Sequence, residues 1–260
     1  AGRDIDDAIK VAKQYDFSHY VFDYQDKFYD GVIHNFIESY ANGETPVPCI
    51  QCNQTVKFTD LLNESKNLKA DALVTGHYAI RKGGLNKSKL FKAKDKKKDQ
   101  SYFLFATLQD QLDYVRFPLG NYLKSEIRKM AKDYNLIVSD KPDSQDICFV
   151  TSNSYRDLIN KVNPDINKEG NIFDINGNKI GKHKGISNYT VGQRKGIGVG
   201  GQNKPLYVKE VNKNQNYIVL AEYESLQQNK IFFKNINLLE DGIKNTQLEC
   251  SAKIRSTQSE

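Results

Sequence analysis

The first half of the chain alternates helical and strand-like patterns, and this alternation constrains the fold more than any other feature. Apolar residues at helical spacing predict a helix over 4–15, and the short apolar run 19–24 predicts a strand. Two further helices, over 26–43 and 53–68, lead to a predicted buried strand over 70–78 that ends in Gly-His. This order is typical of an α/β domain with a parallel sheet.

The pattern changes near residue 152. Before it, helical patterns over 101–108 and 123–136 continue the α/β order, and 147–150 predicts another short buried strand. After it, turns rich in Gly, Asn and Lys separate short alternating strands, as in β-barrels and sandwiches, and 204–222 predicts a hairpin. We therefore expect three domains: an α/β domain over 1–152, a small β-rich domain over 153–207, and a partial β-barrel over 208–260.

Charge and cysteine content narrow the class of protein. The net charge of +6 and pI of about 8.9 favour an anionic partner such as nucleic acid. No apolar run approaches the length of about 18 residues of a membrane helix, and no secretory signal opens the sequence. Four unevenly spaced cysteines do not make a disulfide framework. We expect a cytoplasmic, monomeric protein with reduced thiols.

Two cysteines three residues apart follow two prolines in "ETPVPCIQCN", residues 44–53. Pro46 and Pro48 favour an extended, rigid loop that holds Cys49 and Cys52 at a fixed separation. A zinc knuckle would need two more ligands, and the sequence has no second C-x-x-C. An idle buried pair remains an alternative. A redox or sulfur-handling role is favoured, because a thiolate is both a nucleophile and a sulfur carrier.

Other candidate residues carry weaker signals. Cys148 lies in an apolar run, where a buried structural cysteine is the simplest interpretation. Gly76 and His77 end a predicted strand, the place where open α/β sheets bind ligands. The glycine-rich basic segment 189–201 is no phosphate-binding Walker loop but suits an RNA backbone. A lysine run is either a solvated loop or a phosphate contact: Lys94, Lys96, Lys97 and Lys98.

Six stretches together resemble one family. "ETPVPCIQCNQTVKF", "LVTGHYAI", "KDQSYFLF", "FPLG", "DSQDICFV" and "GKHKGISNYTVGQRKGIGVGG" have the order and spacing found in the bacterial tRNA-specific 2-thiouridylases. The resemblance covers essentially the whole chain. It implies a Rossmann-like domain of the PP-loop ATPase type, a central tRNA-binding domain and a C-terminal barrel. It also implies ATP-dependent 2-thiolation of the wobble uridine of tRNA.

The resemblance further implies roles for individual residues. Cys148 would receive sulfur as a persulfide and Cys52 would attack that persulfide across one active site, so that the two could close a disulfide. Gly76 would contact ATP. Residues implied to contact the tRNA or its target base are Val47, Pro48 and Cys49 at the base, and His77, Lys98, Asp99, Gln100, Arg255 and Ser256 elsewhere on the tRNA.

The implied cofactors and partners follow from the reaction. ATP, with Mg²⁺, would adenylate the C2 oxygen of the uracil, and sulfur would then displace AMP. The sulfur would arrive as a persulfide from a relay protein or a cysteine desulfurase. The partner nucleic acid would be a tRNA with a modifiable wobble uridine.

Two departures from the family pattern bear on activity. The family has Asp at the position of Cys49, and a thiol does not replace a carboxylate at neutral pH. Cys49, Cys52 and Cys148 could instead hold an iron–sulfur cluster. No stretch matches the family's "SGGxDSS"-type loop, and both ends look cut. We therefore expect that adenylation fails in the chain as given, and a non-catalytic tRNA-binding protein is the alternative.

Overall fold

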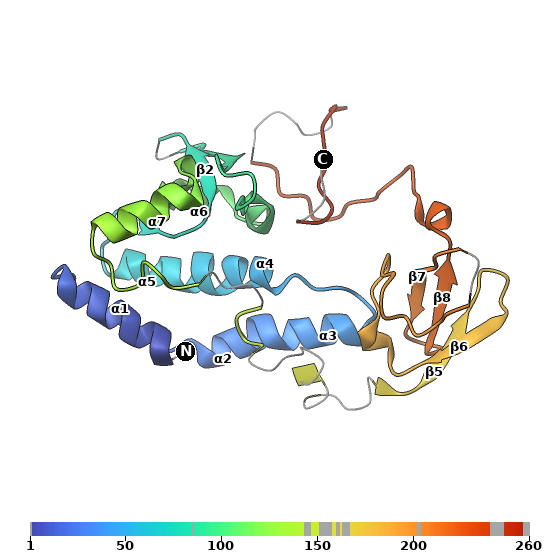
Figure 1. Cartoon of the computed structure of the whole chain (residues 1–260). Coiled ribbons are helices and arrows are strands. Elements are labelled where there is room, and N and C mark those ends of the chain that lie inside the picture. Colours follow the sequence, from blue (N-terminus) through green and yellow to red (C-terminus); the bar gives the residue numbers. More distant parts are fainter. Residues whose placement is uncertain are drawn as a thin grey trace. The chain divides into compact units, whose positions relative to one another are not determined.

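The chain forms two compact units. The computed structural model describes residues 2–84, 86–142, 147–150, 158–159, 162, 167–201, 204–239 and 247–256 (Figure 1). Unit 1 comprises Ala1–Phe28, Cys49–Gln145 and Asn235–Glu260, and unit 2 comprises Tyr29–Pro48 and Asp146–Lys234. Each unit has its own hydrophobic core.

Helices make up most of unit 1. The longest is continuous from Pro48 to Asn67 and runs from blue to cyan in Figure 1. Its middle part has the wider π-helical winding, in which the hydrogen bond spans five residues. The helices are α1 (Gly2–Gln14), α2 (Gln25–Phe28), α4 (Pro48–Cys52), η2 (Asn53–Leu61), α5 (Leu62–Asn67), η3 (Ser101–Leu104), α6 (Gln109–Tyr114), η4 (Pro118–Asn121) and α7 (Lys124–Asp133).

Two small sheets complete unit 1. Strand β1 (Leu73–Val74) pairs in parallel with β4 (Val115–Arg116), and β2 (Ala79–Lys82) pairs antiparallel with β3 (Lys89–Lys92). The helix that starts at Pro48 buries one face against these strands. The core consists of Phe58, Leu62, Ala79, Leu104, Leu112, Val115 and Phe117.

A four-stranded sheet forms the centre of unit 2, in the order β6-β5-β8-β7. Strands β5 and β8 are parallel and the other pairs are antiparallel. Among the residues that the structure describes, the sheet is open and forms no closed barrel. The strands are β5 (Gly170–Phe173), β6 (Lys179–His183), β7 (Tyr207–Asn212) and β8 (Tyr217–Ala221), with short helices η6 (Ile186–Asn188) and η7 (Tyr223–Leu226).

A second helical element belongs to unit 2. The helix that starts as α2 continues through η1 (Tyr29–His34) into α3 (Asn35–Ala41). Phe36, Ile37 and Tyr40 on α3 are buried together with Ile159. The end of α3 is tied to the sheet, since the Lys213 ammonium donates to the Asn42 side-chain carbonyl at 2.6 Å.

Most of the predicted pattern is confirmed. An α/β region is followed by a β-rich region, and the helices predicted over 4–15, 26–43, 53–68 and 123–136 are present. The predicted hairpin is β7–β8, which pair antiparallel. The boundary expected after residue 207 falls within β7, which lies in one sheet with β5 and β6. The division into three domains therefore remains a proposal.

Four predicted elements differ from the structure. Residues 19–24 and 147–150 form no strand, because no neighbouring strand pairs with either segment within the described residues. The strand predicted over 70–78 is shorter, and its Val74 is exposed. Over 101–108 only the single turn η3 forms. Apolar composition alone predicted the strands over 19–24 and 147–150, and neither segment has a pairing strand in the described chain.

Gly43 ends α3 as the sequence predicts. Its φ is +73°, and its N–H donates to the carbonyl of Tyr40 at 3.0 Å. The next N–H, of Glu44, donates to the carbonyl of Ser39 at 2.9 Å. These two bonds form a Schellman motif, in which a left-handed residue satisfies the last carbonyls of a helix.

Replacing Gly43 by Ala tests this cap. A Cβ there would lie 2.9 Å from Cγ1 of Val211 and would also be strained by the positive φ, which costs about 1–3 kcal/mol. Gly177→Ala is the matched control, because its φ is +84° but no atom lies within 4 Å of the added Cβ. We expect Gly43→Ala to lower the urea midpoint more than Gly177→Ala. Equal midpoints would show that the contact with Val211 relaxes freely.

Candidate nucleotide and RNA site

The C-x-x-C pair lies on a helix and not in a loop, which corrects the prediction. Pro48 is the first residue of α4, a position that proline favours because its missing N–H has no helical partner there. Cys49 is exposed and Cys52 is partly buried. Residues three apart on a helix share one side, so both thiols are presented together.

A cleft of about 410 Å³ lies at the carboxyl end of β1. Gly76 is exposed in it, and a Cβ added there would have only Leu119 within 4 Å. The backbone of Gly76 is therefore open to a ligand, at the end of a parallel strand where α/β sheets bind nucleotides. The cleft is lined by Lys57, Leu61, Leu73, Val74, Thr75, Gly76, His77 and Gln100. Three of the predicted site residues are thus brought together: Gly76, His77 and Gln100.

His77 is held as a neutral imidazole. Its Nδ1 is 2.8 Å from the hydroxyl oxygen of Thr75, and its ring packs against those of Phe58 and Phe117. Burial, followed by repulsion from the ammonium of Lys57, lowers the pKa of His77 to about 4. At neutral pH this side chain therefore contributes a hydrogen-bonding group and no charge.

Lys57 brings the positive charge to this cleft, although it was not among the residues predicted from the sequence. Its ammonium donates to the side-chain carbonyl of Asn53 at 3.0 Å. Asn53 is buried and donates in turn to the carbonyl of Phe103 at 3.1 Å. Asn53 and Lys57 lie one helical turn apart on η2. In the sequence, only their position in the helix that follows Cys52 could have indicated a role at this site.

The predicted tRNA contacts Asp99 and Gln100 have internal partners. Gln100 accepts from the N–H of Tyr78 at 2.9 Å and donates its own N–H to the carbonyl of Tyr78 at 2.8 Å. The Asp99 carboxylate accepts from the N–H of Ala93 at 2.8 Å and from the hydroxyl of Ser101 at 2.7 Å. Both side chains therefore shape the loop, whatever else they contact.

The lysine run forms a turn with mixed exposure. The Asp95 carboxylate accepts from the N–H of Lys97 at 3.1 Å, and Lys94 forms an ion pair with Glu126 at 3.1 Å. Lys98 is partly buried, whereas Lys96 and Lys97 are exposed. Lys96 and Lys97 are thus the members best placed for a phosphate backbone.

Arg255 and Ser256 lie on a segment that returns to unit 1. The hydroxyl of Tyr102 donates to the carbonyl of Ile254 at 3.2 Å, which places the segment beside η3. Both Arg255 and Ser256 are exposed. The predicted contact residues at 98–100 and 255–256 therefore lie on two segments that this hydrogen bond to η3 connects.

Cys148 lies in unit 2 on a turn whose neighbours are anchored. Ile147 and Phe149 pack against the core of α3, and the rings of Phe149 and Phe36 are 5.3 Å apart at nearly a right angle. Cys148 itself is exposed and carries a free thiol. The prediction of a buried strand cysteine is wrong, and the alternation of anchored and exposed residues explains the exposure.

The residues before the C-x-x-C pair also belong to unit 2. Val47 is partly buried and Pro48 is buried. The hydroxyls of Thr45 and Thr190 are 3.1 Å apart, which ties this segment to the one after η6.

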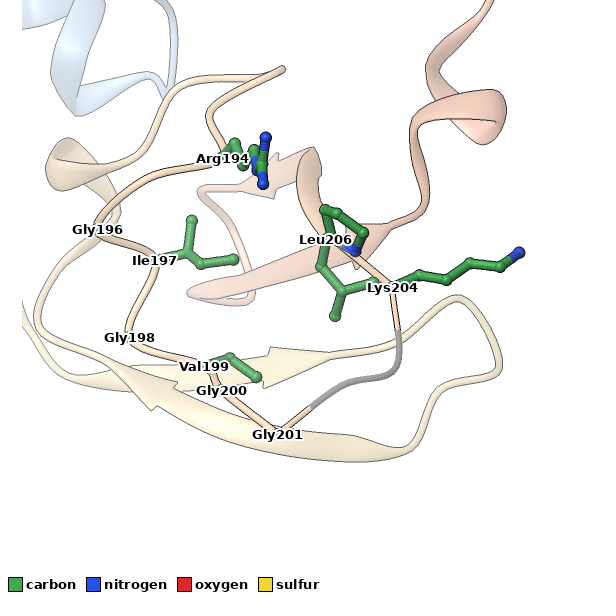
Figure 2. Close-up of a pocket in the computed structure, with 10 residues that line it drawn as sticks. Arg194, Gly196, Ile197, Gly198, Val199, Gly200, Gly201, Lys204 and Leu206 are labelled. Carbon is green, nitrogen blue, oxygen red and sulfur yellow. The ribbon is translucent and has the colours of Figure 1, made fainter.

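The glycine-rich basic segment encloses a hollow of about 650 Å³ in unit 2 (Figure 2). Figure 2 shows Ile197 and Val199 directed inward, and both belong to or pack against the core of the sheet. The glycines next to them in the segment have open space where a Cβ would stand: Gly196, Gly198, Gly200 and Gly201. Arg194 and Lys204 also line the hollow, and Lys204 pairs with Glu222 at 2.7 Å.

The three cysteines of the alternative iron–sulfur cluster are distributed over both units, with Cys49 and Cys52 in unit 1 and Cys148 in unit 2. The cluster therefore stays a hypothesis. Within the described ranges, no three His, Cys, Asp or Glu side chains lie together as metal ligands would.

No described helix has the length and apolar character needed to cross a membrane.

The depressed pKa of His77 predicts a pH dependence of stability. Between pH 6.5 and about 4 the unfolded histidine binds a proton that the folded one does not, so the free energy of unfolding falls as the pH is lowered through this window. The loss is about 3 kcal/mol at most. Urea unfolding at pH 7 and pH 4.5 measures it, with His77→Gln as the control. An equal pH-dependent loss in both proteins would contradict the assignment.

A second prediction concerns the exposed lysines. Replacing Lys96 and Lys97 by Gln should weaken tRNA binding and reduce the salt slope of log K, by about 0.9 per lost phosphate contact. Lys10→Gln/Lys13→Gln on α1 removes the same charge and should leave the slope unchanged. Salt titrations by fluorescence anisotropy give the slope. An unchanged slope in the first variant would identify the run as a solvated loop.

Comparison with known proteins identifies the family. A family model described as the tRNA methyl transferase HUP domain matches residues 1–152, and one described as the tRNA methyl transferase PRC-barrel domain matches residues 157–222. Among curated relatives, the tRNA-specific 2-thiouridylase MnmA of Rickettsia massiliae is 48% identical over 259 residues, 99% of this chain and 71% of the relative. The same enzyme of Rickettsia prowazekii is also 48% identical, over 99% of this chain and 72% of the relative. A Rossmann-like HUP region is therefore followed by a PRC-barrel region, and the chain belongs to the tRNA-specific 2-thiouridylase family.

Proposed function

We propose that this protein carries out ATP-dependent 2-thiolation of the wobble uridine of tRNA. The observation that carries the proposal is one helix. It presents Cys49 and Cys52 at its start and contributes Lys57 to the cleft that contains Gly76 and His77. A sulfur nucleophile and a nucleotide-sized cleft are thus built on one rigid element, in a chain from a family of thiolating enzymes.

Recognition of the tRNA would combine charge with exposure of one base. A loop base is splayed out more readily than a paired one, and C2 of a stacked uracil is closed to a nucleophile. Val47, Pro48 and Cys49 would face the extruded base. Basic residues would hold the phosphates and fix the register: the exposed Lys96, Lys97 and Arg255 and the partly buried Lys98, with His77 and Ser256 as neutral contacts.

Activation of the base requires ATP. The uracil C2 oxygen would attack the α-phosphorus of ATP and release pyrophosphate, with Mg²⁺ neutralising the phosphate charge. The C2–O bond would then be ready to break, because AMP is a far better leaving group than hydroxide. The open backbone at Gly76 would lie against the nucleotide.

Sulfur transfer would follow from the two cysteines. A relay protein or a cysteine desulfurase would load the exposed thiol of Cys148 as a persulfide. The Cys52 thiolate would attack the inner sulfur of Cys148, form a disulfide and release hydrosulfide, which adds to C2 and expels AMP. An external thiol would reduce the disulfide for the next cycle.

Cys49 separates this scheme from a cluster mechanism. In the persulfide scheme it touches the target base and forms no bond to sulfur, whereas a cluster would need it as a ligand. The scheme also fits a monomer in the cytoplasm, where tRNA and reduced thiols are found together.

The direct test supplies tRNA, ATP, Mg²⁺ and a persulfide donor to the purified protein. From a protein that also carries the family's SGGxDSS-type loop, we expect 2-thiouridine at the wobble position, detected by nucleoside mass spectrometry, with one AMP per thiolated tRNA. Binding of tRNA and sulfur loading of Cys148 are measured as separate steps. Neither step needs adenylation, which depends on an SGGxDSS-type loop that the sequence does not contain. Incorporation of a methyl group from a methyl donor, without sulfur, would refute the proposal.

Cysteine variants assign the individual steps. Cys148→Ser should remove persulfide loading, measured as a loss of the 32-dalton adduct on intact protein, while tRNA affinity stays the same. Cys52→Ser should load normally but release no sulfide. Cys49→Ser should retain both steps, and a simultaneous loss of bound iron and sulfur release in that variant would favour the cluster instead.

A further inference from the structure

We propose that Lys57 binds a phosphate oxygen in the cleft beside Gly76 and His77, with Asn53 as its positioning residue. The inference rests on the proposed function and deepens it, because it assigns a contact that neither the family resemblance nor the sequence pattern points to. Either the phosphate of the adenine nucleotide or a phosphate of the tRNA backbone could supply the ligand.

The first argument is the charge of the cleft. Lys57 is partly buried and lines the cleft wall. Within the described part of the chain, no carboxylate lies within ion-pair distance of its ammonium. A partly buried cation beside neutral groups is costly unless an anion arrives. The neighbouring imidazole of His77 is neutral and does not compete for that anion.

The second argument is the orientation of the ammonium. The amide nitrogen of Asn53 donates to the carbonyl of Phe103, so the amide oxygen must face the other way, toward Lys57. A carbonyl oxygen accepts one of the three ammonium protons and cannot neutralise the charge. Asn53 therefore holds Lys57 in place while the charge and two donors remain for a ligand.

The third argument is the room available. The cleft of about 410 Å³ is within the range of small-molecule sites. Gly76 lets a ligand approach the backbone closely, since the nearest atom to a Cβ there would be 3.8 Å away. A phosphate against Lys57 would thus be accompanied by a sugar or base along the strand end, as in other α/β nucleotide sites.

The helix connects this contact to the sulfur chemistry. Lys57 follows Cys52 by five residues, and the hydrogen bonds of a π-helix join residues five apart. One π-helical turn therefore separates the attacking thiol from the ammonium. The phosphate of the AMP leaving group would be held one turn away from the cysteine that releases the sulfur.

The test measures binding of AMP and of tRNA to the wild-type protein, Lys57→Gln and Lys57→Arg. We expect Lys57→Gln to weaken AMP about ten-fold or more, as loss of a charge-assisted hydrogen bond does, and Lys57→Arg to restore part of the affinity. The His77 ring signals in NMR spectra should shift on addition of AMP to the wild type at pH 7. Lys10→Gln is the matched control on an exposed surface, and amide spectra check folding.

The two arms identify the source of the phosphate. If Lys57→Gln lowers the affinity for AMP alone, the phosphate belongs to the nucleotide. If it lowers the affinity for tRNA alone, with a salt slope smaller by about 0.9, the phosphate belongs to the RNA backbone. Unchanged affinity for both ligands in Lys57→Gln would overturn the proposal. Absence of 2-thiouridine formation by a protein that carries the SGGxDSS-type loop, alongside a Lys57-dependent AMP contact, would refute the proposed function and leave the contact standing.

Discussion

The burial of Phe58 fixes the candidate site of unit 1. This ring is fully enclosed in the core, and Leu62, one turn later, is buried beside it. A helix anchored at these two positions cannot rotate, so the directions of Cys52 and Lys57 follow from the packing. The same ring packs against His77 and thereby joins the helix to the end of β1. One aromatic side chain thus sets the phase of the sulfur-bearing helix and the environment of the cleft.

The sequence predicted those features that depend on local patterns. Three such features depend only on residues close together in the sequence, and all three are found: the helical periodicity, the glycine after α3 and the asparagine-rich turn of the β7–β8 hairpin. The family assignment rested on six motifs and agrees with the comparison to known proteins. Patterns that depend only on near neighbours were therefore sufficient for the fold class.

Features that depend on distant partners could not be predicted. The apolar run 19–24 has strand composition but no partner strand in the described chain, and it stays exposed. Asp99 and Gln100 resemble surface contacts in the sequence, but the backbone groups of Ala93 and Tyr78 occupy them. The link from Phe103 through Asn53 to Lys57 spans fifty residues. Tertiary contact, and not composition, decides each of these cases.

The bare glycines around the hollow of unit 2 have a consequence for how mutations in this protein are interpreted. At Gly200 the backbone is not left-handed and no atom stands where a side chain would go. The folded chain by itself therefore exerts almost no selection against larger residues at this position. A survey that scores only abundance or solubility would rate the position as permissive, and any intolerance that cells show there would come from whatever approaches the backbone from outside.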